Sequence, residues 1–521
     1  MTEVFDTQER RRASTLYNLF MVAFFGHLLL NFFGTSLVLY SYIVVTALAL
    51  ISLFYYDWKT TFQILCFMAL IEGQGRILFG YNPVFRLLFD ILTLIAILRS
   101  SLRSKHIFAF SFLPKFTSMM IVLHFLWFLL EIFNPDGASL FASFATAKFY
   151  IFPFLLLFTH FNNPIDVTSN NFQKFLKIFL SALGLISLLC VFQKYQGSDY
   201  MNSLSPFYSN LFSKFERFQG TFYRPWGTSY TPGGFSVFYS LCLSMVFIFG
   251  LKRTGDGRQK ATFGYVLIMA LVMLSTFVLF ISQVRSLLVK SLAIVLLSIF
   301  SGFLGTTQVV KRTILIFVTF CIASVGTYFF VEALPFLDQS FDLEVSVNRL
   351  SELGDSDKVT TARATPELVI KRLTEQVEFP LGYGLGLTTA FLPDYQVARD
   401  RRSLDIPADN FWNGDNVILF FFLELGIGAL FILFSYLSFP YYLFSMSVES
   451  LKNFSRTEYI IISTAFIQVL IVTLGNWGAA TIVYNPESFF IMFWVGIGFH
   501  TFYSAKNKIL VENEKFDKIN T

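Results

Sequence analysis

The chain has few charged residues for its length. Only 14% of its 521 residues are Asp, Glu, Lys or Arg, whereas 55% are hydrophobic, and the mean hydropathy is +0.61. A soluble chain of this length would form several domains, but this composition excludes that organisation. Apolar runs long enough to cross a bilayer recur from end to end. The sequence therefore predicts an all-α polytopic integral membrane protein with about 14 (12–14) transmembrane helices.

Motifs for metals, nucleotides and disulfides are missing. The four cysteines lie inside apolar runs, without a CxxC or Cys/His spacing, which argues against a disulfide framework and a structural zinc site. Neither a GxxxxGK[ST] loop nor a GxGxxG fingerprint in a strand–helix setting occurs. We therefore expect no metal, no cofactor and no nucleic-acid partner.

The apolar runs give fourteen candidate spans. Three arginines at 10–12 precede the first run, but the run is long and "NFFGTS" is a poor cleavage site, so we expect an uncleaved first helix. The expected spans are 16–33, 36–56, 61–72, 84–99, 116–133, 145–160, 174–193, 233–250, 262–282, 286–304, 312–331, 416–438, 457–474 and 485–504.

The distribution of Lys and Arg orients these spans. With the N-terminus in the cytoplasm, basic residues gather in the short inner segments, while the outward turns at 34–35 and 475–484 have none. Two long outward loops, 194–232 and 332–415, break the pattern, as long loops do. We expect an N-terminal bundle over 1–331, a large outer loop over 332–415, C-terminal helices over 416–521, and both termini in the cytoplasm.

A few charged residues lie near the outer surface in this topology. Arg285 stands in "SQVRS", between two apolar runs, where a cation at mid-bilayer would cost about 2.5–3.5 kcal/mol. A membrane anchor and a functional site are both open explanations for it. Other charges have structural explanations: Arg86 and Asp90 are spaced for an ion pair on one helix, Glu72 and Arg76 could pair across a re-entrant turn, and Lys148 and Lys290 could reach headgroups.

Four short motifs follow one another in the second half of the chain, and their order is informative about the family. They are Arg217-x-x-Gly220-Thr-Phe before a span, then "SQVRS", then "EFPLGYGLG" in the outer loop, and lastly Asp415-Asn416 leading into a helix with Glu424, Gly426 and Gly428. In this order the chain resembles the bacterial O-antigen polymerase and O-antigen ligase superfamily over roughly residues 210–430. The resemblance implies a GT-C-like membrane fold.

The resemblance implies a metal-independent glycosyltransferase of the bacterial inner (cytoplasmic) membrane. Such an enzyme transfers a polyprenyl-diphosphate-linked oligosaccharide to a sugar hydroxyl at the outer face, and a chain-length regulator is an optional partner besides the lipid bilayer. Ligases of this superfamily typically have histidine where this chain has Asp415, which favours a polymerase for O-antigen or exopolysaccharide. An O-antigen ligase acting on lipid A core and, from another class, a transporter of lipid-linked oligosaccharides stay open.

Roles follow from matching residues to these motifs. Arginine grips phosphate oxygens with two parallel hydrogen bonds, so Arg285 and Arg217 are expected to hold the donor diphosphate, with Arg224 and Arg372 as further candidates. Asp415 is the candidate base and Asp409 its rival, although a helix N-cap would also explain an aspartate there. Supporting residues would be Glu424, Asn416 and Gly384. Trp226, Tyr223, Trp412 and Tyr383 could offer aromatic faces to sugars or anchor the chain at the interface.

Overall fold

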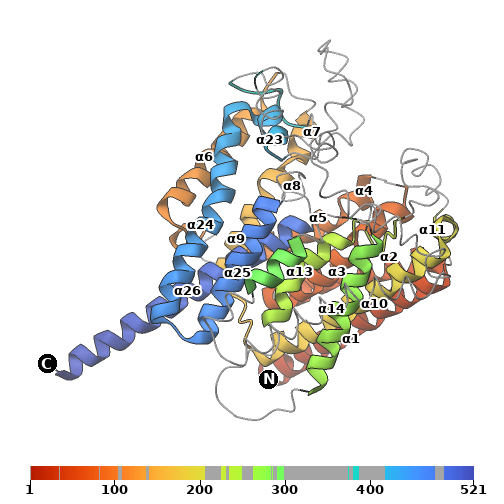
Figure 1. The fold of residues 1–521 in the computed structure, drawn as a ribbon, viewed down its shortest axis with the longest axis horizontal. Coiled ribbons are helices and arrows are strands. Elements are labelled where there is room, and N and C mark those ends of the chain that lie inside the picture. Colours follow the sequence, from red (N-terminus) through yellow and green to blue (C-terminus); the bar gives the residue numbers. More distant parts are fainter. Residues whose placement is uncertain are drawn as a thin grey trace. The chain divides into compact units, whose positions relative to one another are not determined.

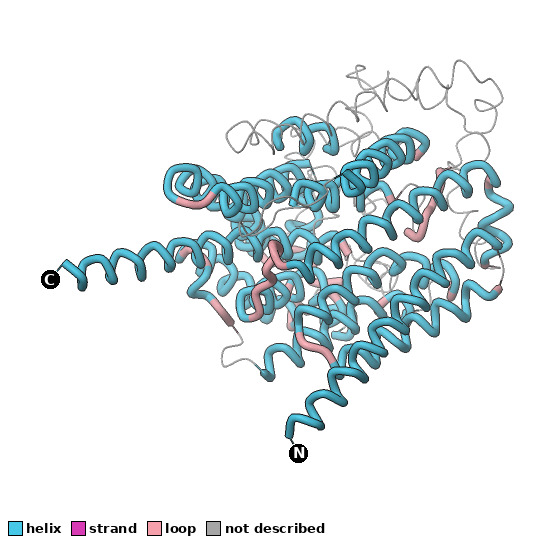
Figure 2. The backbone as a smooth tube through the Cα atoms, turned by 90° about the horizontal axis from the view of Figure 1, so that it is seen from below, coloured by secondary structure: helices cyan, strands magenta, loops and turns pink. Residues whose placement is uncertain are grey.

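The computed structural model is helical throughout the part of the chain that it describes. That part comprises residues 2–34, 36–80, 83–103, 108–135, 140–205, 224–229, 234–248, 262–282, 284, 290–298, 374, 380–386, 417–475 and 486–520. Figure 2 shows helices and short connections over these residues, with no strand among them. The chain forms two compact units. Unit 1 comprises 1–103 and 165–351, and unit 2 comprises 104–164 and 352–521.

Unit 1 is built from the early helices. They are α1 (Thr2–Leu30), η1 (Asn31–Phe33), α2 (Leu37–Tyr55), α3 (Trp58–Leu78), α4 (Pro83–Arg86), α5 (Leu88–Arg103), α10 (Asn170–Gln196), α11 (Ser198–Leu204), α13 (Ser236–Ile248) and α14 (Thr262–Ile281). In its core α3 packs against α2, α5 and α10, and α10 packs against α14. Buried phenylalanine rings join these helices: Phe67 lies 5.0 Å from Phe24 and 5.7 Å from Phe175 between ring centroids. Part of the high phenylalanine content is thus core rather than lipid-facing surface.

Unit 2 combines a middle stretch of the sequence with the C-terminal helices. Its elements are η2 (Phe110–Phe112), α6 (Lys115–Ile132), α7 (Leu140–Ala145), α8 (Ala147–Tyr150), α9 (Phe152–Asn162), α23 (Val417–Leu425), η6 (Gly426–Gly428), α24 (Ala429–Asn453), α25 (Arg456–Gly475) and α26 (Glu487–Asn520). Within this unit α6 packs along α24, and α26 packs against α25 and α9 (Figure 1).

The described helices confirm a helical membrane protein in outline. Seven helices among the described residues are long and apolar enough to cross a membrane. The expected spans 36–56 and 457–474 match α2 and α25 closely. The fourteen-span count and a GT-C-like arrangement stay predictions, because the span at 312–331 and most of 286–304 lie outside the described residues. The expected segment boundaries at 331 and 415 lie there too.

Four expected spans differ from the helices observed. The span at 61–72 was too short, because α3 continues to Leu78 through Glu72 and Arg76. The span at 84–99 is two helices, α4 and α5, interrupted at Leu87, so Arg86 and Asp90 do not share one continuous helix. The span at 145–160 is part of a broken series, α7 to α9. The span at 416–438 is interrupted at Gly426, where the backbone is left-handed with φ +51°.

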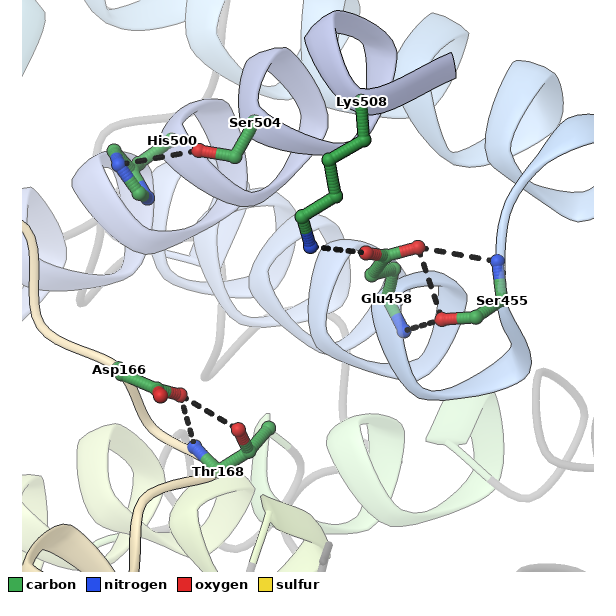
Figure 3. Close-up of polar contacts among 7 residues, drawn as sticks. All are labelled: Asp166, Thr168, Ser455, Glu458, His500, Ser504 and Lys508. Atoms are coloured by element: carbon green, nitrogen blue, oxygen red, sulfur yellow. Dashed lines mark hydrogen bonds and ion pairs between the residues drawn. The ribbon is translucent and has the colours of Figure 1, made fainter. Parts of the chain in front are cut away.

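Polar side chains define several helix starts. Asp57 caps α3 by accepting from Thr60 N–H at 3.1 Å, and Ser169 caps α10 in the same way through Phe172 N–H. At α25, Ser455 N–H donates to Glu458 Oε2 at 3.1 Å while Glu458 N–H returns a bond to Ser455 Oγ, a reciprocal capping box (Figure 3). Lys508 on α26 lies 3.4 Å from the same carboxylate.

Candidate functional site

The residues expected from the sequence divide into described and undescribed ones. Arg224, Gly384 and Glu424 are described. Six others lie outside the described residues: Arg217, Arg285, Arg372, Asp409, Asp415 and Asn416. The roles expected for these six therefore stay predictions. The local structure around Glu424 and Gly384, in unit 2, is the part of the expected site that can be built from contacts.

The glycine-rich stretch of the outer loop docks on a break in a helix. We name residues 380–386 the glycine loop. In an unbroken helix Ile427 N–H would bond to Leu423 O, four residues earlier. Instead Ile427 N–H donates to Pro380 O and Tyr383 N–H donates to Leu423 O, each at 2.8 Å. The glycine loop thus supplies hydrogen-bond partners for Ile427 N–H and Leu423 O, the two groups that would bond to each other if α23 and α24 were one helix.

This contact requires glycine on both sides. Gly382 and Gly426 have φ of +70° and +51°, a region that side chains with a β-carbon disfavour. A β-carbon on Gly382 would lie 2.5 Å from Gly426 N, and one on Gly426 would overlap Pro380 O. Two of the motifs that carried the family resemblance therefore form one structural unit, although the sequence could not say that they meet.

A tryptophan on α6 also contacts the helix break. The Trp127 indole N–H donates at 2.9 Å to the carbonyl oxygen of Leu425, the last residue of α23. A β-carbon on Gly428 would overlap the same indole, so this glycine lets α6 approach closely. Gly428 therefore permits close packing of α6, whereas Gly426 accommodates the glycine loop.

Glu424 is fully buried two residues before the break at Gly426. Its Oε2 accepts a hydrogen bond from Tyr150 Oη at 2.7 Å, and Tyr150 is also fully buried. Tyr150 O in turn lies 3.0 Å from His124 Nε2 on α6. A carboxyl group buried in this way needs such partners, because desolvation of an ionised or polar group is costly. The sequence expected a supporting role for Glu424, and Tyr150 is the partner that it did not identify.

A second acid lies at the end of α6. Glu131 is 1% exposed, and its Oε2 accepts from Asn134 Nδ2 at 2.8 Å. The carboxyl of Glu424 is near enough to act on Glu131 electrostatically, and the indole of Trp127 lies near the Glu131 carboxyl. We name Glu131, Glu424, Tyr150 and Trp127 the acid cluster. Sequence reasoning missed Glu131, although an acid at the end of an apolar run in "WFLLEIF" is a functional signal by default.

In unit 1 the stretch around Arg224 is held by backbone contacts. The Gln193 side chain on α10 accepts from Trp226 N–H and Gly227 N–H, at 3.0 and 2.7 Å, and donates to Gly227 O at 2.9 Å. Thr228 Oγ1 donates to Leu70 O on α3. Arg224 is half-buried at the start of this anchored stretch. Trp226 is fully buried, so it packs in the core and presents no open face to a sugar.

Unit 1 also contains a buried polar cluster on α1, η1 and α3. Glu72 and Arg76 form an ion pair one helical turn apart, with Arg76 Nε 2.6 Å from Glu72 Oε1. His27 Nε2 lies 2.9 Å from Gln74 Oε1, and Gln74 Nε2 donates to Asn31 Oδ1. We name these five residues the paired cluster. The expected Glu72–Arg76 pairing is confirmed, although it occurs along a helix and not across a turn.

The other charged residues singled out from the sequence have local contacts. Lys148 on α8 is half-buried, with Nζ 4.7 Å from the centroid of the Phe149 ring. Lys290 is 9% exposed at the start of a described helical stretch, residues 290–298. Ser282, the first residue of "SQVRS", closes α14 by donating from N–H and Oγ to Val278 O and Leu279 O. Arg285 follows three residues later, outside the described residues.

Within the described residues no group of three or more His, Cys, Asp or Glu side chains could hold a metal ion. Cys66, Cys190 and Cys242 are buried free thiols in that part of the chain. Comparisons with known proteins found no match to a family model, a curated protein or a solved structure. The case for a function therefore depends on the residues themselves.

Proposed function

We propose that this protein is a polysaccharide polymerase of a bacterial inner membrane. It transfers an oligosaccharide from polyprenyl diphosphate to the hydroxyl of a sugar on the outer side, in a metal-independent reaction. The O-antigen or exopolysaccharide type of product follows from the motif resemblance. The proposal includes the fourteen-span topology, with both termini in the cytoplasm, and a GT-C-like fold.

The observation that carries the proposal is the docking of the glycine loop on the helix break. "FPLGYGLG" and the segment with Glu424, Gly426 and Gly428 were two separate motifs of the resemblance. In unit 2 they contact each other through paired backbone hydrogen bonds and two glycines that no larger residue could replace. Chance similarity in two unrelated stretches gives no reason for such a contact, whereas one site built from both motifs does.

The proposed chemistry assigns a step to each charged group. The acceptor oxygen forms a bond to the anomeric carbon while the bond from that carbon to the diphosphate oxygen breaks. Polyprenyl diphosphate leaves with the electron pair, and Arg285 and Arg217 stabilise its negative charge. The acceptor proton passes to Asp415, with Asp409 as the rival base. Arg224 and Arg372 are second-rank contacts to the donor, and Asn416 supports the base.

The test is elongation by the purified protein. We expect a ladder of products spaced by one repeat when polyprenyl-diphosphate-linked oligosaccharide is added without nucleotide or metal. Arg285→Ala should remove the ladder, and Arg285→Lys should impair it strongly because lysine lacks the planar fork. Arg456→Ala, an exposed arginine at the start of α25, is the matched control and should elongate normally.

Other products would identify the other functions. One transfer to added lipid A core, without elongation, would identify a ligase. Movement of the lipid-linked oligosaccharide across vesicles, without any transfer, would identify a transporter. Full elongation by Arg285→Lys would overturn the role of the arginine fork and leave Arg285 as a membrane anchor.

A further inference from the structure

Glu131 is a buried acid, and its side chain is 1% exposed. Among the described residues only one of its two carboxyl oxygens has a hydrogen-bond partner. Oε2 accepts from Asn134 Nδ2, whereas Oε1 has no hydrogen-bond partner among the described residues. Buried polar atoms in native proteins nearly always have a partner, and each exception calls for an explanation.

The position is unfavourable for a carboxyl in two further ways. Glu131 lies in the last turn of α6, where the exposed carbonyl groups give the helix end a partial negative charge. Glu424, the other acid of the cluster, is near enough to repel charge on it. A glutamine or methionine would fit the same space at lower cost. Residues kept against stability in this way are typical of functional sites.

The missing partner is a hydrogen-bond donor that can arrive from outside. Phe133, the C-cap residue of α6, is 78% exposed, so α6 ends at the surface of unit 2 with Glu131 in its last turn. In the proposed topology this end of α6 is the outer one. A sugar hydroxyl would supply the donor.

We propose that Glu131 is an acceptor-binding residue whose Oε1 accepts a hydrogen bond from a hydroxyl of the acceptor sugar. This inference rests on the proposed polymerase function and adds the acceptor side of the site, in unit 2. The base remains Asp415 or Asp409, and Glu131 takes no proton in this scheme. The Trp127 indole and Tyr150 keep the helix break and Glu424 in place beside it.

The test compares elongation and stability in the same variants. Glu131→Gln keeps an oxygen for Asn134 but offers an NH₂ group where Oε1 was, so it meets the acceptor hydroxyl less well. Glu131→Met removes both oxygens at similar length. We expect the acceptor KM to rise about tenfold, the loss of roughly one hydrogen bond, with kcat changed far less. The midpoint of thermal unfolding should stay the same or rise.

The matched control is Glu449→Gln. Glu449 is an exposed acid near the far end of α24, 3.2 Å from Lys506, and its variant should keep the wild-type acceptor KM. Wild-type acceptor KM in both Glu131 variants would overturn the inference while leaving the polymerase intact. Loss of elongation together with a lower unfolding midpoint would show a structural role and also overturn it. A wild type that elongates nothing would overturn the proposed function itself, and this role with it.

Discussion

Two clusters of buried polar side chains in this protein differ in how far the cost of their burial is compensated by partners. In the paired cluster of unit 1, Glu72 has Arg76 as its counter-ion, and His27, Gln74 and Asn31 bond to one another. In the acid cluster of unit 2, Glu131 and Glu424 are two acids near enough to interact, and Glu131 Oε1 has no partner within the described structure.

This difference indicates that one cluster stabilises the fold and the other serves the proposed function. A buried charge with a counter-ion is compensated within the fold, so removing one partner damages the fold. A buried acid near another acid, with one carboxyl oxygen that has no partner within the described structure, contributes little to the stability of the fold. That oxygen can accept a hydrogen bond from a ligand. We infer that the paired cluster holds unit 1 together and that the acid cluster belongs to the site. The predictions below test this contrast, from the largest expected effect to the smallest.

Breaking the ion pair should have the largest effect on stability. Glu72→Gln leaves the Arg76 guanidinium buried without its counter-ion, which typically costs about 3–5 kcal/mol. We expect low yield and a strongly reduced unfolding midpoint in detergent. Replacing both residues with methionine should recover most of the stability, since a well-packed apolar pair often substitutes for a buried ion pair. Wild-type stability in Glu72→Gln would remove the distinction between the clusters.

Displacing the glycine loop should come next. In Gly426→Ala the methyl group overlaps Pro380 O and the left-handed backbone is strained, a cost of about 1–3 kcal/mol for the conformation alone. Elongation should be lost because the loop can no longer pair with Leu423 and Ile427. Gly26→Ala on α1 is the control: no atom lies within 4 Å of its β-carbon, so stability should rise by up to ~1 kcal/mol. Normal elongation by Gly426→Ala would contradict the role of the docked loop.

Removing one hydroxyl from the acid cluster should have an intermediate effect. Tyr150→Phe deletes the bond to Glu424 Oε2, and leaving a buried acceptor without this partner costs about 1–3 kcal/mol. We expect a moderate loss of stability together with slower elongation, since Glu424 is no longer held. Tyr40→Phe, at an exposed position on α2, should change neither. Unchanged elongation in Tyr150→Phe would separate Glu424 from the reaction.

The smallest effect should come from the helix cap at the start of α25, which contains no residue of either cluster. Ser455→Ala removes the capping box at the start of α25, which is worth about 1 kcal/mol. The unfolding midpoint should fall slightly, and the acceptor KM and kcat should stay at wild-type values. A clear loss of elongation here would mean that any small destabilisation stops transfer, and activity could then no longer distinguish the clusters.

Sequence patterns predicted the bounds of those helices that do not depend on particular tertiary contacts. Hydropathy placed α2 and α25 within a residue or two, because each is one uninterrupted apolar run. Hydropathy failed where contacts among buried polar side chains determine the length of a helix. At α3 the polar residues Glu72, Gln74 and Arg76 ended the apolar run, yet the helix continues because they bond to one another or to His27.

The site was predictable in part for the same reason. Motif order identified Glu424 and the glycine loop, but their contact depends on backbone hydrogen bonds that no side-chain pattern encodes. Tyr150 and Trp127 were out of reach because they come from α8 and α6, far from α23 in the sequence. Glu131 was within reach, since it is a lone acid closing an apolar run.

The most direct test of the account measures two glutamine variants side by side. Glu72→Gln and Glu131→Gln each replace one buried glutamate with glutamine, and both are compared with wild type for unfolding midpoint and for elongation per folded molecule. We predict that Glu72→Gln lowers the midpoint strongly, and that Glu131→Gln leaves the midpoint equal or higher while raising the acceptor KM about tenfold. If Glu131→Gln instead unfolds at a lower temperature and elongates with wild-type constants, the acid cluster is structural and the central claim is wrong.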